Sequence, residues 1–183
     1  QRTSLETKAR AEGTTRNFQI SERGRDGQLA RASQRAEYYP IRYITPLEAN
    51  RRALGVDVLT INAPAEVIPR TLADGKASAT RAFKLTQETE GKLGIVIYQR
   101  TSPAIPADTG KPDGLVFVAL RIDDAINGAL RGHAIAGIDY CLSDVTAREP
   151  VGQRLAGLAE CPEQDKEGAG GLILFRRRDQ QGQ

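Results

Sequence analysis

The sequence predicts an α+β fold, and three observations support this prediction. Segments in which apolar residues alternate with polar ones, as in half-buried strands, recur along the chain, for example in residues 37–44 and 77–85. Short stretches rich in helix formers lie between these segments, but no regular βαβ repeat is present, which argues against a doubly wound sheet. Residues 102–114, rich in proline and glycine, interrupt the pattern, and we interpret them as a lobe boundary or an exposed loop.

The elements expected before this boundary follow from local signals. Residues 4–12 contain helix formers behind Ser4, a candidate N-cap, and Gly13 provides a stop. Residues 18–30 predict a hairpin that turns at Asp26-Gly27. The remaining expected elements are a strand at 39–44, one or two helical turns at 46–54, a helix from Pro64 to Gly75, and strands at 77–85 and 92–99.

The part of the chain after the boundary predicts a second set of strands around one helix. Residues 115–122 form a nearly continuous apolar run, as expected of a central strand. The helix expected at 123–132 begins with Asp123 and Asp124, and we expect one to cap it and the other to complement its dipole. Further strands are expected at 137–144, 153–161 and 170–178.

Composition excludes several classes of function. The formal net charge is +3, but the basic residues are scattered among acids and aromatic residues are few, so we expect no nucleic-acid partner. His133 is the only histidine, and with Cys141 and Cys161 it cannot assemble the usual zinc ligand sets, so we expect no metal and no cofactor. No Walker loop or nucleophilic triad is present, and an enzyme that uses Asp123 and Asp124 is the weakest of the hypotheses.

The sequence also lacks a run of about 20 apolar residues that would cross a bilayer. It contains no methionine, so we expect a fragment whose flanking membrane helices would lie outside it.

Asp57 is the main candidate for a site residue, because it is a lone carboxylate between Val56 and Val58 in an apolar stretch. A carboxylate beside an apolar cavity can anchor a polar ligand through hydrogen bonds, while apolar walls supply contact area. We expect those walls to come from the faces of neighbouring strands, namely Tyr43, Phe83, Leu85 and Ile97. The alternative is an aspartate that caps or braces a turn, and the sequence leaves both interpretations open.

Six short motifs then resemble a known family in their order and spacing. They are Tyr38–Pro40, Pro46–Asn50, Leu54–Asp57, Gly75-Lys76, Gln87-Glu88 and Ile122–Asp124. The set resembles the CHASE domain, the extracytoplasmic sensory domain of histidine kinases and nucleotide cyclases.

The resemblance implies two stacked PAS-like lobes on the outer, periplasmic or extracellular, face of the cytoplasmic membrane. Residues 1–101 would form the membrane-distal lobe, residues 102–114 a linker and residues 115–183 the membrane-proximal lobe. The long N-terminal helix of such domains would be absent from this chain, and residues 97–102 replace the usual Leu-Pro-Val-Tyr.

The resemblance also implies a function and a site. The chain would be a non-catalytic ligand sensor in a homodimeric receptor, with a histidine kinase, diguanylate cyclase or phosphodiesterase module elsewhere in the full-length protein. Asp57 matches a position that contacts the ligand in plant cytokinin receptors, and Ala79 matches another position that lines the pocket there. The alternative function is an extracytoplasmic protein-interaction or structural module that binds no small molecule.

A disulfide between Cys141 and Cys161 is a further hypothesis. The two residues lie on expected strands around a turn near Pro150, and the resemblance places them in an oxidising compartment. Two buried free thiols are the alternative.

Overall fold

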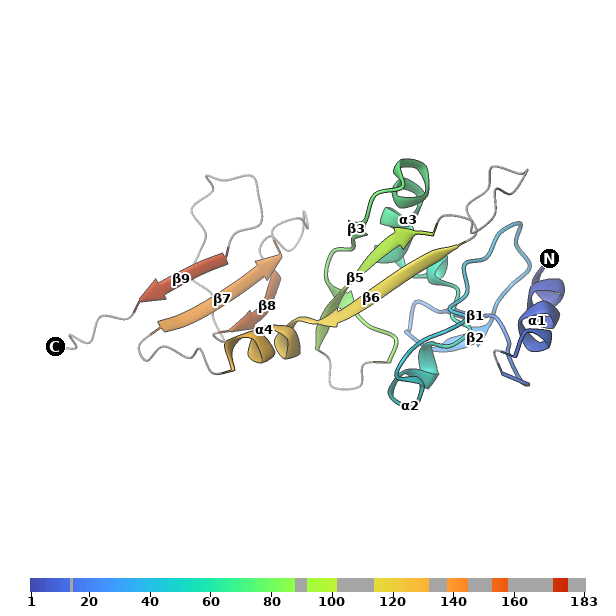
Figure 1. The fold of residues 1–183 in the computed structure, drawn as a ribbon, viewed down its shortest axis with the longest axis horizontal. Coiled ribbons are helices and arrows are strands. Elements are labelled where there is room, and N and C mark those ends of the chain that lie inside the picture. Colours follow the sequence, from blue (N-terminus) through green and yellow to red (C-terminus); the bar gives the residue numbers. More distant parts are fainter. Residues whose placement is uncertain are drawn as a thin grey trace. The chain divides into compact units, whose positions relative to one another are not determined.

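The computed structural model of the chain describes residues 1–13, 15–87, 92–101, 114–131, 138–144, 153–157 and 173–177. The chain falls into two compact units, each built from segments that are separated in the sequence. Figure 1 labels the helices and strands. The first unit contains Gln1–Thr80, Thr86–Thr89 and Ile97–Val118, and the second contains Arg81–Leu85, Glu90–Val96 and Ala119–Gln183.

The first unit opens with a helix and a hairpin. Helix α1 spans Arg2–Ala11, so it begins before Ser4, and the expectation that Ser4 caps it is wrong because Gln1 is the N-cap residue. Strands β1 (Ser21–Arg23) and β2 (Leu29–Arg31) are antiparallel, with Glu22 opposite Ala30. The predicted turn is confirmed, and Gly27 in it has a φ of +80° that glycine adopts without strain.

A short extended segment, residues 55–58, pairs with other segments on both of its edges. On one edge Ser21 N donates to the Gly55 carbonyl at 2.9 Å, and Asp57 N donates to the Ser21 carbonyl at 2.8 Å. On the other edge Ile41 N donates to the Val56 carbonyl at 3.0 Å. Val56 and Val58 are buried, as expected of a segment enclosed on both sides.

The strand predicted at 39–44 is therefore wrong beyond its first residues. Only residues 39–41 pair with 55–58, through an isolated bridge between Pro40 and Asp57 and the bonds around it. Pro40 has no N–H to donate to a ladder, and the Tyr43 side chain is 64% exposed, so the alternation of Tyr39, Ile41 and Tyr43 does not mark one buried face.

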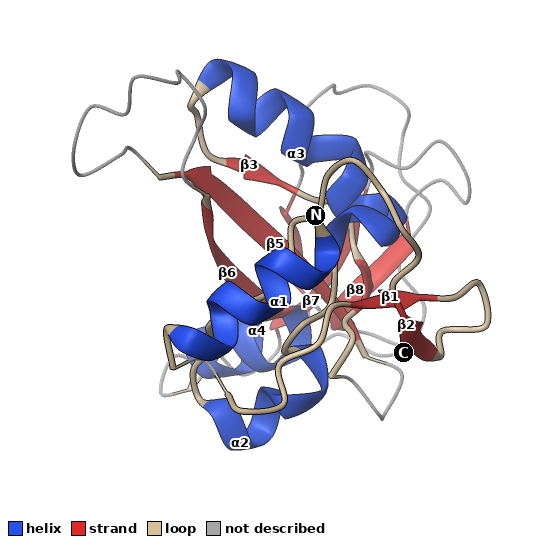
Figure 2. Cartoon of the chain, turned by 90° about the vertical axis from the view of Figure 1, so that its right-hand side faces the viewer, coloured by secondary structure: helices blue, strands red, loops and turns tan. Residues whose placement is uncertain are grey.

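Short helical elements follow this segment in the first unit. Helix α2 (Leu47–Asn50) continues into the 3₁₀ turn η1 (Arg51–Ala53), which confirms the predicted helical turns. A second 3₁₀ turn, η2, spans Val58–Thr60. Helix α3 spans Asn62–Asp74, has Pro64 in its first turn, and ends as predicted at Gly75 in the left-handed conformation. Figure 2 shows α3 beside β3.

The main sheet contains β3 (Ser78–Ala79), β4 (Phe83–Lys84), β5 (Leu93–Arg100) and β6 (Leu115–Arg121). The strand expected at 77–85 is thus two short strands, and both are antiparallel to β5. Strand β6 also pairs with β5. The rings of Tyr98 and Phe117 are 5.9 Å apart, so these two side chains share one face of the sheet.

The alternation of side chains then places Val116 and Val118 on the opposite face of β6, together with Ile97 and its partner Ala79. This open face, defined by Ala79, Ile97, Val116 and Val118, is not covered by packing, since the two valines are 54% and 56% exposed. The strand expected at residues 115–122 is confirmed. Its expected central position is wrong for the described strands, because β6 pairs with β5 alone and the valines on one of its faces are exposed.

The second unit contains helix α4 and a three-stranded sheet. Helix α4 spans Ile122–Leu130, and strands β7 (Ile138–Asp144), β8 (Gln153–Gly157) and β9 (Ile173–Arg177) pair antiparallel in the order β8-β7-β9. The Tyr140 hydroxyl lies 3.1 Å from Asn127 Oδ1 and joins β7 to α4.

Neither acid at the start of α4 is its N-cap, which corrects the predicted cap. The N-cap residue is Arg121, and Asp123 and Asp124 both lie in the first turn, where negative charge suits the helix dipole. Asp124 Oδ2 lies 3.4 Å from Arg121 Nε.

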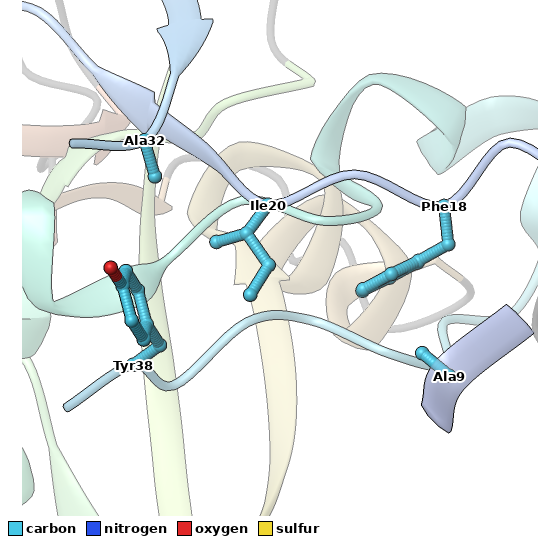
Figure 3. Packing of buried hydrophobic residues seen from close by; sticks show 5 residues of the cluster. All are labelled: Ala9, Phe18, Ile20, Ala32 and Tyr38. Carbon is cyan, nitrogen blue, oxygen red and sulfur yellow. The ribbon is translucent and has the colours of Figure 1, made fainter. Parts of the chain in front are cut away.

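A small apolar cluster lies between α1 and the hairpin of the first unit (Figure 3). Its buried members are Ala9, Phe18, Ile20, Ala32 and Tyr38. Only Phe18, Ile20 and Tyr38 are large, so this cluster supplies limited hydrophobic stabilisation.

These elements confirm an α+β fold, and the two PAS-like lobes stay a prediction. Most of the predicted linker at 102–114, together with His133 and Cys161, lies outside the described residues, so the lobe boundaries and the disulfide also stay predictions. None of the helices in the described part of the chain is long and apolar enough to cross a membrane.

Gly55 provides a test of the paired segment. Its φ is +83°, and an added Cβ would lie 2.1 Å from the Gln19 carbonyl oxygen. We expect Gly55→Ala to lower the free energy of unfolding by about 3–5 kcal/mol, measured by urea denaturation followed by circular dichroism.

Gly27→Ala is the matched control, because Gly27 has a similar φ of +80° but a Cβ there would meet only ordinary contacts with Arg23. We expect it to lose about 1–2 kcal/mol. Equal losses in the two variants would contradict the close approach of residues 19 and 55.

Candidate functional site

Asp57 lies at the centre of the first unit and is fully buried, with 0% exposure. Its backbone pairs with Ser21, and its side chain caps the 3₁₀ turn η2. The apolar neighbours Val56 and Val58 bury the segment, while the local turn orients the carboxylate toward backbone N–H groups. The position therefore combines a buried charge with a fixed geometry.

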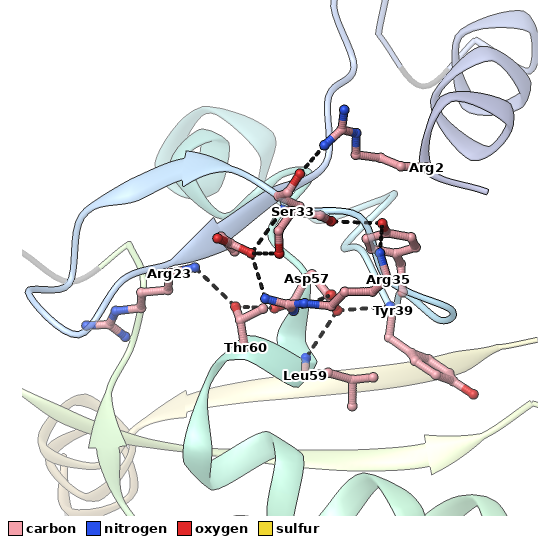
Figure 4. Close-up of polar contacts among 11 residues, drawn as sticks. Arg2, Arg23, Ser33, Arg35, Tyr39, Asp57, Leu59 and Thr60 are labelled. Atoms are coloured by element: carbon pink, nitrogen blue, oxygen red, sulfur yellow. Dashed lines mark hydrogen bonds and ion pairs between the residues drawn. The ribbon is translucent and has the colours of Figure 1, made fainter.

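The two oxygens of this carboxylate have different surroundings (Figure 4). Oδ1 accepts hydrogen bonds from Tyr39 N at 3.0 Å and from Leu59 N at 3.2 Å. Oδ2 is buried and accepts no hydrogen bond, although Arg35 Nη1 lies 3.5 Å away. One oxygen thus joins two backbone segments, and the other has only an ionic neighbour.

Arg35 is shared between Asp57 and Glu22. Its Nη2 atom lies 2.6 Å from Glu22 Oε2, and its side chain is 38% exposed. Glu22 Oε2 also accepts bonds from the backbone N–H and the hydroxyl of Ser33, both at 3.1 Å. The backbone N–H of Ser33, with smaller contributions from its hydroxyl and from Arg35, holds the pKa of the Glu22 carboxyl below its usual value.

The loop that carries Arg35 is held by Tyr38. The Tyr38 hydroxyl donates to the Ser33 carbonyl at 2.8 Å and accepts from Arg35 N at 2.6 Å. Because the ring of Tyr38 belongs to the buried cluster, the loop is anchored to the core of the first unit. Arg35 is therefore positioned beside Asp57 by packing as well as by charge.

Tyr39 contributes its backbone N–H to the site. Burial, and to a lesser degree the charge of Glu37, raises the pKa of the Tyr39 phenol, so the phenol stays protonated at neutral pH. Its hydroxyl donates to Glu37 Oε1 at 3.2 Å.

The other predicted site residues lie in three places. Tyr43 is exposed, and Arg42 lies over its ring at 5.2 Å. Ala79 and Ile97 are direct partners across β3 and β5, so the structure brings these two together in the first unit. Phe83 and Leu85 belong to the second unit. A role for any of these residues in ligand binding stays a prediction.

The chemistry of the site is that of recognition. Asp57 has backbone donors and a guanidinium as neighbours, and no nucleophile or base accompanies it in the contacts described above. Within the described ranges, no group of three or more His, Cys, Asp and Glu side chains is placed to hold a metal ion. A carboxylate in such surroundings can accept hydrogen bonds from N–H or O–H groups of a ligand.

Sequence reasoning missed Arg35 and Glu22. They lie 22 and 35 residues before Asp57, in a region where basic and acidic residues alternate, and such alternation is typical of a solvated surface. Ser33 is the one small polar residue in the stretch from Ser33 to Tyr38, so the sequence carried little signal of the loop that positions Arg35.

Comparison with known proteins defines the class of this chain as a sensory domain of signalling receptors. A family model described as CHASE domain matches residues 1–152, which is most of the 183-residue chain. The chain belongs to the CHASE domain family, as its motifs predicted. CHASE domains are extracytoplasmic and non-catalytic. A search of the curated proteins found no match to this chain.

Substitution of Asp57 tests how much its carboxylate stabilises the first unit. Asp57→Ala leaves the N–H groups of Tyr39 and Leu59 buried without an acceptor, and we expect a loss of about 2–5 kcal/mol in the free energy of unfolding. Asp57→Asn should lose less, because its amide oxygen can accept the same two bonds. Urea denaturation followed by circular dichroism measures both.

Asp26→Ala is the control, since Asp26 also accepts a backbone bond, from Gln28 N at 3.0 Å, but does so in an exposed turn. It should cost less than about 1 kcal/mol. An Asp57→Ala variant as stable as Asp26→Ala would show that Asp57 does not brace the unit.

Proposed function

We propose that this CHASE domain is the ligand-sensing ectodomain of a membrane-bound receptor, either a histidine kinase or a diguanylate cyclase or phosphodiesterase. It would bind a small molecule in the first unit, and catalysis would belong to another part of the full-length receptor. The observation that carries the proposal is the buried Oδ2 atom of Asp57, which accepts no hydrogen bond.

Buried carboxylate oxygens almost always accept a hydrogen bond, so Oδ2 has unused capacity. Arg35 Nη1 lies 3.5 Å from Oδ2, and that guanidinium has a closer partner in Glu22 at 2.6 Å. A ligand N–H or O–H could therefore bond to Oδ2 while Arg35 keeps its pair with Glu22. Oδ1 would continue to accept from Tyr39 and Leu59 and would hold the carboxylate in place.

The apolar part of the ligand would rest on side chains of the first unit. Ala79 and Ile97 are neighbours on the open face, and Tyr43 offers an exposed ring. A ligand with a polar donor group and a flat or branched apolar body fits this set of residues.

A protein-interaction module is the second candidate, and a specific observation favours it. Val116 and Val118 are more than half exposed on the same face as Ala79 and Ile97. An apolar sheet face of this kind also suits a protein contact, including one between two copies in a homodimeric receptor.

A thermal-shift screen against small molecules that carry N–H or O–H donors distinguishes the two candidate functions. A ligand at a hundredfold excess over its Kd stabilises the native state by about 2.7 kcal/mol, which raises the Tm of a chain of this size by about 5–10 °C. Calorimetric titration of the hit then compares wild type, Asp57→Asn and Arg35→Gln.

We expect Asp57→Asn to weaken binding by about ten- to a hundredfold, because the ligand loses a charged acceptor. Arg35→Gln is the matched control, and it should keep or improve the affinity, since Arg35 competes with the ligand for Oδ2. Unchanged affinity in a folded Asp57→Asn variant would contradict the role of Asp57. A screen without hits, together with self-association that Val118→Lys abolishes, would favour the second candidate.

A further inference from the structure

The face of α1 that packs on the first unit is polar. Only Glu6 and Ala9 are buried in this helix. Arg2, Glu6 and Arg10 follow each other at intervals of four residues, so they lie on one face, one turn apart. Helices of globular proteins usually bury an apolar stripe, whereas α1 buries the charged Glu6 at the middle of this row, with Arg2 and Arg10 partly exposed on either side.

Glu6 is the centre of this row and is 1% exposed. Its Oε1 atom accepts a hydrogen bond from Ile20 N at 2.9 Å, just before β1. Its Oε2 atom lies 3.3 Å from Arg31 on β2 and 3.5 Å from Arg10 on α1 itself. One carboxylate therefore joins α1 to both arms of the hairpin.

The other contacts of α1 are polar as well. Arg10 Nε donates to the Phe18 carbonyl at 2.9 Å, and Arg2 donates to the Ala32 carbonyl. Beyond the last turn, Glu12 pairs with Arg42, and this pair lowers the pKa of the Glu12 carboxyl. Each turn of α1 thus has its own polar contact with the rest of the unit.

The apolar contribution of α1 is small by comparison. Ala9 is its only member of the buried cluster, and Leu5 is 38% exposed. A helix of this length is marginal in water by itself, so α1 stays helical only while it is docked. Loss of the contacts of Glu6 would therefore unfold the helix as well as detach it.

We propose that α1 can detach from the rest of the first unit and that the contacts of Glu6 with Ile20, Arg10 and Arg31 hold it in place. We call this set of contacts the latch. The helix undocks and melts as one piece, while the paired segment 55–58, α3 and β5 stay folded. A helix with a docked and an undocked state is the kind of bistable element through which a sensory domain can change conformation. This inference does not depend on the presence of a small-molecule ligand.

Hydrogen–deuterium exchange of the whole chain, resolved by peptides, tests the latch. The variant Glu6→Gln keeps the size of the side chain and removes its charge, so the guanidinium groups of Arg10 and Arg31 lose their shared partner. We expect the amides of α1 to exchange about ten- to a hundredfold faster than in wild type. Peptides from α3 and β5 should exchange at the wild-type rate.

Arg31→Gln serves as a second variant, because it removes a partner whose side chain is 55% exposed and leaves Glu6 in place. It should also increase the exchange rate of the α1 amides, but by a smaller factor than Glu6→Gln does. Glu48→Gln is the control, since Glu48 forms an exposed pair with Arg51 on α2, and it should leave α1 unchanged.

Two outcomes would overturn the proposal. In the first, Glu6→Gln increases the amide exchange rates of α1, α3 and β5 by the same factor, or the variant does not fold. Either result would show that α1 unfolds together with the core of the unit. In the second, Glu6→Gln and Arg31→Gln both leave the exchange of α1 at the wild-type rate.

Discussion

The first unit depends on residues 55–58 being paired on both sides, and Asp57 secures this arrangement in two ways. Its backbone N–H bonds to Ser21 on one edge, and its side chain accepts from Tyr39 on the other edge and from Leu59 in the following turn. The segment is too short to hold three stretches of chain by backbone pairing alone. The carboxylate adds the bonds that pairing cannot supply.

Buried charge partly replaces hydrophobic packing in this unit. Glu6 and Asp57 are both fully buried, and each accepts bonds from backbone N–H groups that lie outside regular strands. Such groups stabilise a fold less per residue than well-packed apolar side chains, because a charge loses its hydration on burial. They specify geometry well, however, since few alternative arrangements satisfy a buried carboxylate.

Much of the fold was predictable because the signals are local. The Asp26-Gly27 turn, the end of α3 at Gly75 and the strands at 93–100 and 115–121 follow from residue types at adjacent positions. The strand expected at 39–44 failed because alternation alone does not show whether a face is buried, and Pro40 limits pairing. The cap expected at Ser4 was wrong because the helix begins earlier, at Arg2, with Gln1 as its N-cap residue.

The candidate site was predictable only in part. The apolar neighbours of Asp57 identified it as unusual, and the family motif identified its position. Its partners Arg35 and Tyr39 could not be derived, because they reach it through tertiary contacts across 18 or more residues. Charged residues such as Glu6 and Arg10 also follow the pattern of a solvated helix, so nothing in the sequence indicated that the polar face of α1 is the packed one.

The central claim is that buried carboxylates hold irregular backbone in the first unit. Amide hydrogen exchange of the wild-type chain, followed residue by residue by NMR, tests it most directly. The account predicts that the amides of Tyr39 and Leu59, which donate to buried Asp57, exchange at least about a hundredfold more slowly than the amide of Gln28, which donates to the exposed Asp26. Exchange of Tyr39 and Leu59 as fast as that of Gln28 would contradict it.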